Sequence, residues 1–319
     1  MQVKRKADSK SLTKQKRKSI WKDRNTWELF LLCIPALVGY IMFNYIPIFT
    51  SLQIPFKDYK FSKGILGSEF VGLYNFKFMF ASDLVGRAIR NTFLYGLWFM
   101  LIGTLTNVIL ALLLFEVTNR KALKVYQTTV TLPNFMSMVI VGYITYAILS
   151  PKAGVLNHLL VALGGESIDA YMNAAYWPAI LTIVKIWKGI GMGSLMYFAS
   201  LMGIDPSLFE AAEIDGAKRF QRIRYISIPH LIPLICIFLI MGADDLISGN
   251  FDLFYVIPRD VSMLYRTTDI LNTYVYRALQ LGDYSIGAAV SLLQSVVGMI
   301  LVIVSNMTVK KISPENSMF

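Results

Sequence analysis

Six apolar segments, each long enough to cross a lipid bilayer, constrain this chain more than any other feature of its sequence. A bilayer core of about 30 Å requires roughly 20 mainly apolar residues in a helix. The segments cover residues of about 27–49, 89–115, 126–149, 177–201, 226–246 and 285–309. Backbone groups inside lipid must be hydrogen-bonded within their own segment, so each segment is predicted to be helical. We therefore expect an all-α membrane protein with six transmembrane helices.

The composition agrees with this assignment, because 55% of the residues are hydrophobic and only 16% are charged, against about 25% in soluble domains. Cys33 and Cys236 both lie in apolar runs, so neither a disulfide framework nor a metal site is expected. We expect four prolines to lie near the beginnings of the spans, where a missing N–H costs least. These prolines are Pro35, Pro133, Pro178 and Pro233.

Basic residues are concentrated on one side of the expected spans. The chain has a formal net charge of +11, and a large share of its basic residues lies in 1–26, which is predicted to be a disordered cytoplasmic tail. The segments after the second, fourth and sixth spans are basic as well, through Arg120, Lys121, Lys124, Lys218, Arg219, Arg222, Arg224, Lys310 and Lys311. The positive-inside rule thus predicts that both termini are cytoplasmic. The tail is expected to meet anionic lipid, and nucleic-acid binding is the weaker interpretation.

The cytoplasmic loop at 203–229 has the residue pattern of two short helices. Asp205 is a suitable N-cap, and Pro206 then occupies the first helical position. The first helix is expected to run to about Asp215, and Gly216 is suited to end it in a left-handed conformation. A second, basic amphipathic helix is predicted at 218–228, before Pro229 begins the next span. An ordinary amphipathic helix at the membrane surface is the alternative interpretation of this loop.

The spacing of this loop resembles a known family. The segment Glu210-Ala211-Ala212, with Gly216 six residues after Glu210 and then Ile226-x-x-Pro229, resembles the EAA loop of permeases in binding-protein-dependent ABC importers. Ile228 departs conservatively from the leucine that is usual there. The resemblance extends over about 88–309 and includes the segment at 210–217, which is similar to the carbohydrate branch. Four further motifs resemble the subgroup that imports complex oligosaccharides, at 132–135, 187–191, 273–276 and 310–315.

The resemblance implies the type I ABC importer permease fold and a set of partners. These are an ATPase dimer, a second related permease, an extracellular solute-binding lipoprotein and the lipid bilayer. The chain has no phosphate-binding loop, so we expect it to hold no cofactor and the partner ATPase to bind ATP and Mg²⁺. The residues expected to couple this chain to the ATPase are Glu210, Ala211, Ala212, Asp215, Gly216, Ile226 and Pro229. The small alanines would allow close approach, and Glu210 would pair with a cation of the ATPase.

The expected domain organisation follows from the spans and the resemblance. Residues 27–50 form an additional N-terminal transmembrane helix, which is too long for a secretory signal peptide. Residues 51–87 form an extracellular loop, and 88–310 form a permease core of five transmembrane helices that includes the coupling loop. Residues 311–319 form a cytoplasmic C-terminal tail.

Polar residues inside spans are the candidates for the substrate path, because they are expensive in lipid. On the fourth span these are Lys185, Trp187 and Lys188, and on the third span they are Asn134, Tyr143 and Tyr146. Aromatic rings suit the apolar faces of sugars, and two lysines would suit acidic sugars such as uronates. In the alternative interpretation the lysines pair with Asp244 or Asp245. The long external segments at 53–83 and 244–283 are expected to help receive the binding protein.

Two other classes of membrane protein are alternatives to an importer permease. A secondary transporter usually has more than six spans and discontinuous helices around an ion site, and it remains the alternative function. A membrane-embedded enzyme is disfavoured, because the chain contains only two histidines and no zinc-protease motif. We therefore expect a non-enzymatic permease for a carbohydrate, an oligosaccharide derived from a plant or algal polysaccharide.

Overall fold

The computed structural model describes residues 24–243 and 245–312. The chain divides into two compact units, Met1–Gln53 and Ile54–Phe319. Most of the expected basic tail at 1–26 lies outside the described residues, as does the C-terminal tail from residue 313 on. The first unit contains α2 (Arg24–Tyr40), a π-helical turn η2 (Ile41–Tyr45) and α3 (Ile46–Ser51).

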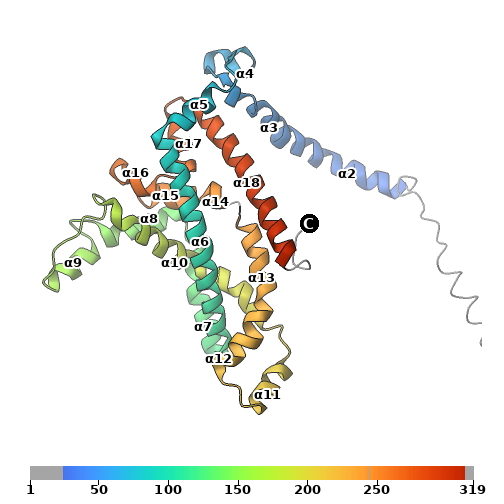
Figure 1. Ribbon diagram of the computed structural model, residues 1–319, viewed down its shortest axis with the longest axis vertical. Coiled ribbons are helices and arrows are strands. Elements are labelled where there is room, and N and C mark those ends of the chain that lie inside the picture. The colour runs from blue at the N-terminus through green and yellow to red at the C-terminus, as the bar shows by residue number, and fades with distance from the viewer. Residues whose placement is uncertain (1–23, 244, 313–319) are drawn as a thin grey trace, which may run out of the picture. The chain divides into compact units, whose positions relative to one another are not determined.

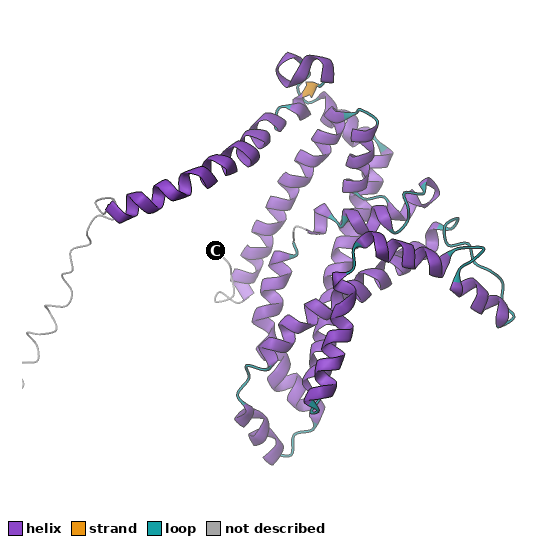
Figure 2. Cartoon of the chain, turned by 180° about the vertical axis from the view of Figure 1, so that it is seen from behind, coloured by secondary structure: helices purple, strands orange, loops and turns teal. Residues whose placement is uncertain are grey.

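The second unit is built almost entirely of helices (Figures 1 and 2). Its long helices are α6 (Asp83–Phe115), α10 (Trp177–Leu201), α13 (Ile228–Met241) and α18 (Tyr284–Ile312). Across the described residues, 5 helices are long and apolar enough to cross a membrane, or 6 if one bent helix pair counts as a span. The α6 helix packs along α10 at the centre of the unit. The prediction of an all-α membrane protein is confirmed.

The third span differs from the straight helix predicted at 126–149. It consists of α7 (Arg120–Thr131), a 3₁₀ turn η5 (Leu132–Phe135) and α8 (Met138–Leu149), and the two helices are bent by 98°. Pro133 lies in this turn and not near the beginning of a span. Met136 is extended with ψ 138°, and the Ser137 hydroxyl then caps a new helix by accepting from the Ile140 N–H. A proline followed by a new N-cap therefore ends one helix and starts another in a different direction.

Of the other three prolines expected near the beginnings of spans, one lies there and two do not. Pro178 occupies the first turn of α10, as predicted, whereas Pro35 and Pro233 lie inside α2 and α13. The second expected helix of the coupling loop is also not separate from the next span. Here α12 (Arg219–Arg222), the π turn η7 (Ile223–Ser227) and α13 follow one another directly, and they form one continuous apolar segment. A proline clashes with the carbonyl four residues before it in an α-helix, and for Pro229 that residue is Tyr225, which lies in the π turn η7.

The outer segments are folded and are not open loops. One contains β1 (Lys57–Asp58), α4 (Gly64–Gly67), β2 (Glu69–Phe70) and α5 (Tyr74–Ala81), in which β1 and β2 pair antiparallel. The other contains α14 (Asp245–Ser248), α15 (Phe251–Val256), η8 (Ser262–Leu264), α16 (Tyr265–Thr268) and α17 (Leu271–Gln280). The remaining outer helix is α9 (Val155–Ala162), and the 3₁₀ turn η6 (Ala174–Tyr176) leads into α10.

The α14 segment packs between the long helices. It contacts α6 and α18, and it lies so close to α6 that a Cβ at Gly96 would be 2.5 Å from the Leu246 Cα. The fifth span therefore ends at Met241, before the predicted residue 246, because Gly242 ends the helix and the chain turns into α14. Small residues are what allow such close backbone contacts between membrane helices. Leu253 and Leu264 are fully buried in a cluster with Trp177 and Leu181 of α10, so the outer helices share the core of the long helices.

Candidate functional site

The coupling loop forms the capped helix that its sequence predicts. The helix α11 (Pro206–Ile214) begins at Asp205, whose carboxylate accepts a hydrogen bond from the Ser207 N–H at 3.0 Å. This hydrogen bond to the charged form holds the pKa of Asp205 below its ordinary value. The helix lies at the opposite end of the core from α4 and α5 (Figure 1). The loop is therefore presented at the end of the core that the charge distribution assigns to the cytoplasm.

Gly216 ends α11 in the predicted left-handed conformation, with φ +75°. The N–H of Gly216 donates to the Glu213 carbonyl at 3.0 Å, and the N–H of Ala217 donates to the Ala212 carbonyl at 2.9 Å. A Cβ at Gly216 would meet nothing within 4 Å. The requirement for glycine here is therefore one of backbone conformation and not of space.

The predicted coupling residues divide into an exposed group and an anchoring residue. Glu210, Ala211, Asp215, Gly216 and Pro229 are exposed, and Ala212 is half-buried. Ile226 instead packs into a cluster around Ala111, Tyr197, Leu201, Ile204 and Leu231, at the ends of the spans that lie near α11. Ile214, at the end of α11, is 87% exposed, although a large apolar side chain is costly in water. The exposed surface of α11 thus combines small and apolar side chains with the carboxylates of Glu210 and Glu213.

Two contacts that the sequence analysis did not identify join this loop to α6. The ring of Phe209 lies 5.7 Å from the ring of Phe115, and a guanidinium nitrogen of Arg219 lies 2.6 Å from a carboxylate oxygen of Glu116. Phe115 is the last residue of α6, and Glu116 follows it. Charge and hydrophobicity alone could not have paired residues so far apart in the chain. The coupling loop is attached to α6 as well as to α10 and α13, which it connects.

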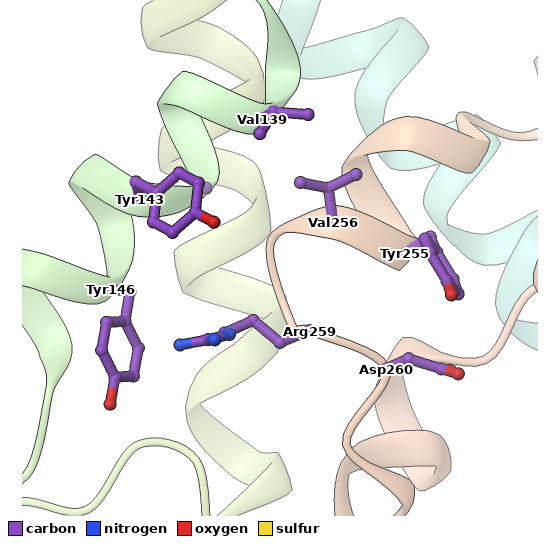
Figure 3. Close-up of a pocket in the computed structure, with 8 residues that line it drawn as sticks. Val139, Tyr143, Tyr146, Tyr255, Val256, Arg259 and Asp260 are labelled. Carbon is purple, nitrogen blue, oxygen red and sulfur yellow. The ribbon is translucent and has the colours of Figure 1, made fainter.

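A cavity of about 250 Å³ lies between α8 and the turn after α15 (Figure 3). It is lined by Val139, Gly142, Tyr143, Tyr146, Tyr255, Val256, Arg259 and Asp260, and we call it the outer cavity. The guanidinium of Arg259 lies 4.3 Å from the centroid of the Tyr146 ring, a cation–π distance. Figure 3 shows the Arg259 side chain directed into the space between the turn and the two tyrosines of α8. Tyr143 and Tyr146 were predicted for the substrate path, whereas Arg259 was not.

The backbone at this turn is held in an uncommon conformation. Arg259 and Asp260 have φ values of 60° and 50°, a left-handed region in which a non-glycine residue is strained. The carboxylate of Asp260 accepts from the Tyr265 hydroxyl at 2.9 Å and pairs with Arg277 at 3.4 Å. Asp260 is therefore engaged by its own neighbours, and Arg259 has no ion pair in the described part of the chain. Of the two charged residues that line the outer cavity, Asp260 is thus paired with Arg277 and not with Arg259.

A buried carboxylate holds these outer helices to α6. Asp269 is 1% exposed and lies 2.5 Å from Arg277, 3.6 Å from Arg87 and 2.9 Å from the Thr273 hydroxyl. The Asn91 amide of α6 donates to the Asp269 backbone carbonyl at 3.0 Å. Burial of a carboxylate is tolerated when it is paired and hydrogen-bonded in this way. Arg277 contacts both Asp260 and Asp269, and so links the outer cavity to α6.

Lys185 lines a second cavity, of about 210 Å³, which we call the inner cavity. Its wall includes Phe99, Thr104, Asn107, Asp245 and Asn250. The Lys185 ammonium lies 6.0 Å from the centroid of the Phe99 ring. Within residues 24–243 and 245–312 it forms no ion pair, so the expected alternative pairing with Asp245 is not made. Asp244 lies outside the described residues.

Lys188 is neither in a cavity wall described above nor paired with Asp245. Its ammonium donates to the backbone carbonyls of Asn134 at 3.0 Å and Met136 at 2.8 Å. Asn134 is thus engaged through its carbonyl, and Trp187 is 40% exposed and outside both cavities. The structure therefore separates the predicted substrate-path residues, with Tyr143 and Tyr146 in one cavity and Lys185 in another. In the described residues, no cluster of His, Cys, Asp or Glu could hold a metal ion.

Several helices long and apolar enough to span a membrane, with an exposed capped helix at one end of the core, define the class of a multi-pass membrane protein. Residues 103–314 match the family described as binding-protein-dependent transport system inner membrane component. The chain belongs to this family, which contains the permease subunits of ABC importers. It is therefore a membrane permease and not an enzyme, and the ATPase is a separate subunit.

Two curated relatives align with almost the whole of this chain. The polygalacturonan/rhamnogalacturonan transport system permease protein YteP of Bacillus subtilis (strain 168) is 33% identical over 288 residues, covering 90% of this chain and 89% of that protein. Protein LplB of the same organism is 35% identical over 293 residues, covering 92% and 91% of the two chains.

Two solved structures are similar as well. The first is a bacterial ABC transporter involved in the import of the acidic polysaccharide alginate, with a TM-score of 0.84, 31% identity and coverage of 92% of this chain and 99% of that one. The second is a bacterial alginate ABC transporter in complex with an alginate pentasaccharide-bound periplasmic protein, with a TM-score of 0.83 and 31% identity over 92% and 98% of the two chains.

Proposed function

We propose that this chain is the permease subunit of an ATP-driven importer for acidic oligosaccharides released from a complex polysaccharide. The observation that carries the proposal is the outer cavity, where Arg259 lies over the ring of Tyr146 and, among the described residues, has no ion pair. Tyr143 and Tyr255 also line this cavity. Aromatic rings pack against the apolar faces of sugars, and a guanidinium binds a carboxylate through two parallel hydrogen bonds. This combination suits a uronate unit.

The inner cavity supplies a second cation along the same core. Lys185 lies in a spanning helix, where an unpaired ammonium is expensive and marks a functional position. Each cavity is smaller than the roughly 300–1,000 Å³ of pockets for drug-sized ligands, so each would hold a short part of a sugar chain. The names of the relatives support an acidic cargo, because YteP is named for polygalacturonan and a similar solved structure belongs to an importer of alginate.

The proposed assembly contains two related permeases, an ATPase dimer that binds ATP and Mg²⁺, and an extracellular solute-binding lipoprotein. The exposed face of α11 would bind the ATPase, with Glu210, Ala211, Ala212 and Asp215 at the contact and Gly216 ending the helix. The periplasmic protein bound to a similar transporter supports the binding-protein partner. Both termini would be cytoplasmic in a cell membrane, as the basic flanks of the spans require.

The experiment measures uptake by the complete transporter reconstituted in liposomes. The binding protein is added on the side of the membrane that the outer segments of the transporter face. The cargo would be trigalacturonate, and a neutral trisaccharide of the same length would serve as control. ATP-dependent uptake of trigalacturonate, with at least a tenfold preference over the neutral sugar, is the expected result. Preference for the neutral sugar would overturn the acidic cargo, and uptake that is independent of ATP would overturn the importer mechanism.

A further inference from the structure

Two of the motifs singled out in the sequence, at 132–135 and 187–191, contact each other in the fold. Lys188 of the second motif donates to the backbone carbonyls of Asn134, in the first motif, and of Met136, just after it. Both carbonyls belong to the bend between α7 and α8, where Met136 is extended and lies outside any helix. Backbone carbonyls at a helix break lose their regular partners, and in a membrane an unbonded carbonyl is costly. The Lys188 ammonium supplies the missing donors.

The same face of α10 holds the bend by close packing. A Cβ at Gly191 would lie 2.0 Å from the Val130 carbonyl oxygen and 2.7 Å from the Thr131 Cα. The end of α7 therefore packs directly against α10 at Gly191, where no side chain intervenes. Pro133 is buried in the turn that follows. One hydrogen-bonded cation and one glycine, three residues apart and thus on one helix face, fasten the bend to α10.

The bend sets where α8 lies, and α8 supplies half of the outer cavity. Val139, Gly142, Tyr143 and Tyr146 all follow the bend on this helix. At its other end α10 leads through a short turn into α11, the coupling helix. The α10 helix thus carries both the attachment of α8, through the bend, and the start of the coupling loop.

We propose that Lys188 is a positioning residue that locks the bent third span to α10, so that α8 and the coupling loop move together. A displacement of α11 by the ATPase would then reach the outer cavity through α10 and the Lys188 contacts. This role differs from that of Lys185 in the inner cavity, although the two lysines are three residues apart. It does not depend on which solute is transported.

Lysine suits this position for a chemical reason. An ammonium has three donors and no acceptor, and its flexible four-carbon stem lets it reach two carbonyls at once. Methionine has a similar length and shape but cannot donate a hydrogen bond. The variant Lys188→Met therefore removes the two donated bonds while largely keeping the packing. Lys188→Arg keeps the charge and the donors, and should restore part of the function.

The test uses the complete transporter in lipid nanodiscs, with Cys33 and Cys236 first replaced by serine because both are free thiols. Spin labels at Ile140 on α8, which does not line the outer cavity, and at Ile183 on α10 then report the distance across the bend by double electron–electron resonance spectroscopy. We expect Lys188→Met to broaden or shift this distance distribution and to lower the uptake rate at saturating solute about tenfold or more. Basal ATP hydrolysis should remain, because the coupling loop is unchanged, while its stimulation by loaded binding protein falls.

Two further variants distinguish the attachment of the bend to α10 from other roles of Lys188. Gly191→Ala attacks the same bend from the packing side, and should shift the same distance even if Lys188→Met inserts poorly. Lys185→Met should leave the distance unchanged and alter the apparent affinity for the solute instead. An unchanged distance in both Lys188→Met and Gly191→Ala overturns the proposal. A Lys188→Met transporter with a normal maximal rate and a raised KM for acidic solutes only would show that Lys188 binds substrate.

Discussion

The guanidinium of Arg259 lies 4.3 Å from the ring centroid of Tyr146, although 113 positions separate the two residues in the chain (259 minus 146). One comes from the turn after α15 and the other from the bent half of the third span. The contact places a cation that has no ion pair among the described residues against an aromatic ring, in a cavity lined by both segments.

Replacement of Arg259 by glutamine should lower the uptake of an acidic oligosaccharide about tenfold or more, because a charge-assisted pair with the carboxylate is lost. Uptake of a neutral oligosaccharide should change little. Transport assays with both sugars measure the ratio of the uptake rate of the acidic oligosaccharide to that of the neutral one. Arg266→Gln is the matched control, since Arg266 is an exposed arginine of the same outer segment that does not line the outer cavity. Equal losses for both sugars would contradict the role of Arg259 in binding a carboxylate.

Gly216→Val should uncouple transport while leaving membrane insertion intact. The cost is conformational, about 1–2 kcal/mol for a left-handed residue with a Cβ, since space around Gly216 is free. Gly216→Asn should be milder, because asparagine tolerates this conformation. Co-purification of the ATPase and the uptake rate are measured together. Gly86→Ala, at an open position without positive φ, is the control, and a loss of insertion in Gly216→Val would make its effect merely structural.

The contact between Arg219 and Glu116 should contribute modestly to coupling. The Arg219 side chain is 65% exposed, and exposed ion pairs contribute roughly 0.2–1 kcal/mol. Arg219→Glu alone should therefore reduce ATP-driven uptake a few-fold, through repulsion of Glu116. The exchanged pair, Arg219→Glu with Glu116→Arg, should recover part of the lost uptake. A double variant that is no better than the sum of the single ones would show that the pair itself has no role.

The N-cap at Asp205 gives a pH dependence with a definite sign. Its pKa is lowered by the hydrogen bond from the Ser207 N–H, so its contribution to the stability of α11 is present above the unfolded pKa and is lost as the pH falls through the lower folded pKa. Around neutral pH this contribution should be constant. Asp205→Ala should increase hydrogen exchange at the first turn of α11, and this difference from the native chain should vanish only in strong acid. Asp205→Asn should keep the cap.

The buried carboxylate of Asp269 should be the most sensitive point of the outer helices. Asp269→Ala leaves Arg277 and Arg87 without their shared partner, and breaking a buried pair costs about 3–5 kcal/mol. A marked fall in the thermal unfolding temperature of the detergent-solubilised transporter is expected. Asp252→Ala, on the same outer segment, provides the comparison. A similar small shift in both variants would show that the Asp269 contacts stabilise little.

The length and apolar character of the segments were enough to predict an all-helical membrane protein. Local sequence also predicted the coupling helix in detail, since an N-cap at Asp205, a first-turn Pro206 and a left-handed Gly216 depend on neighbouring residues alone. For the same reason the prediction was weakest at the prolines. A helix can continue through Pro233 or break beyond Pro133, depending on which neighbours bond the freed carbonyls.

The roles of the two lysines were decided only by the tertiary structure. Lys185 and Lys188 share residue type, helix and face, and sequence periodicity treats them alike. The bend of the third span places two free carbonyls beside Lys188, whereas an opening between α6, α10 and α14 lies beside Lys185. The position of Arg259 in the outer cavity was not predicted, because the turn that carries it lies against α8 only in the folded chain. Hydrophobicity and capping act over a few residues and can be predicted from sequence, but a cavity and its charge arise only when distant segments meet.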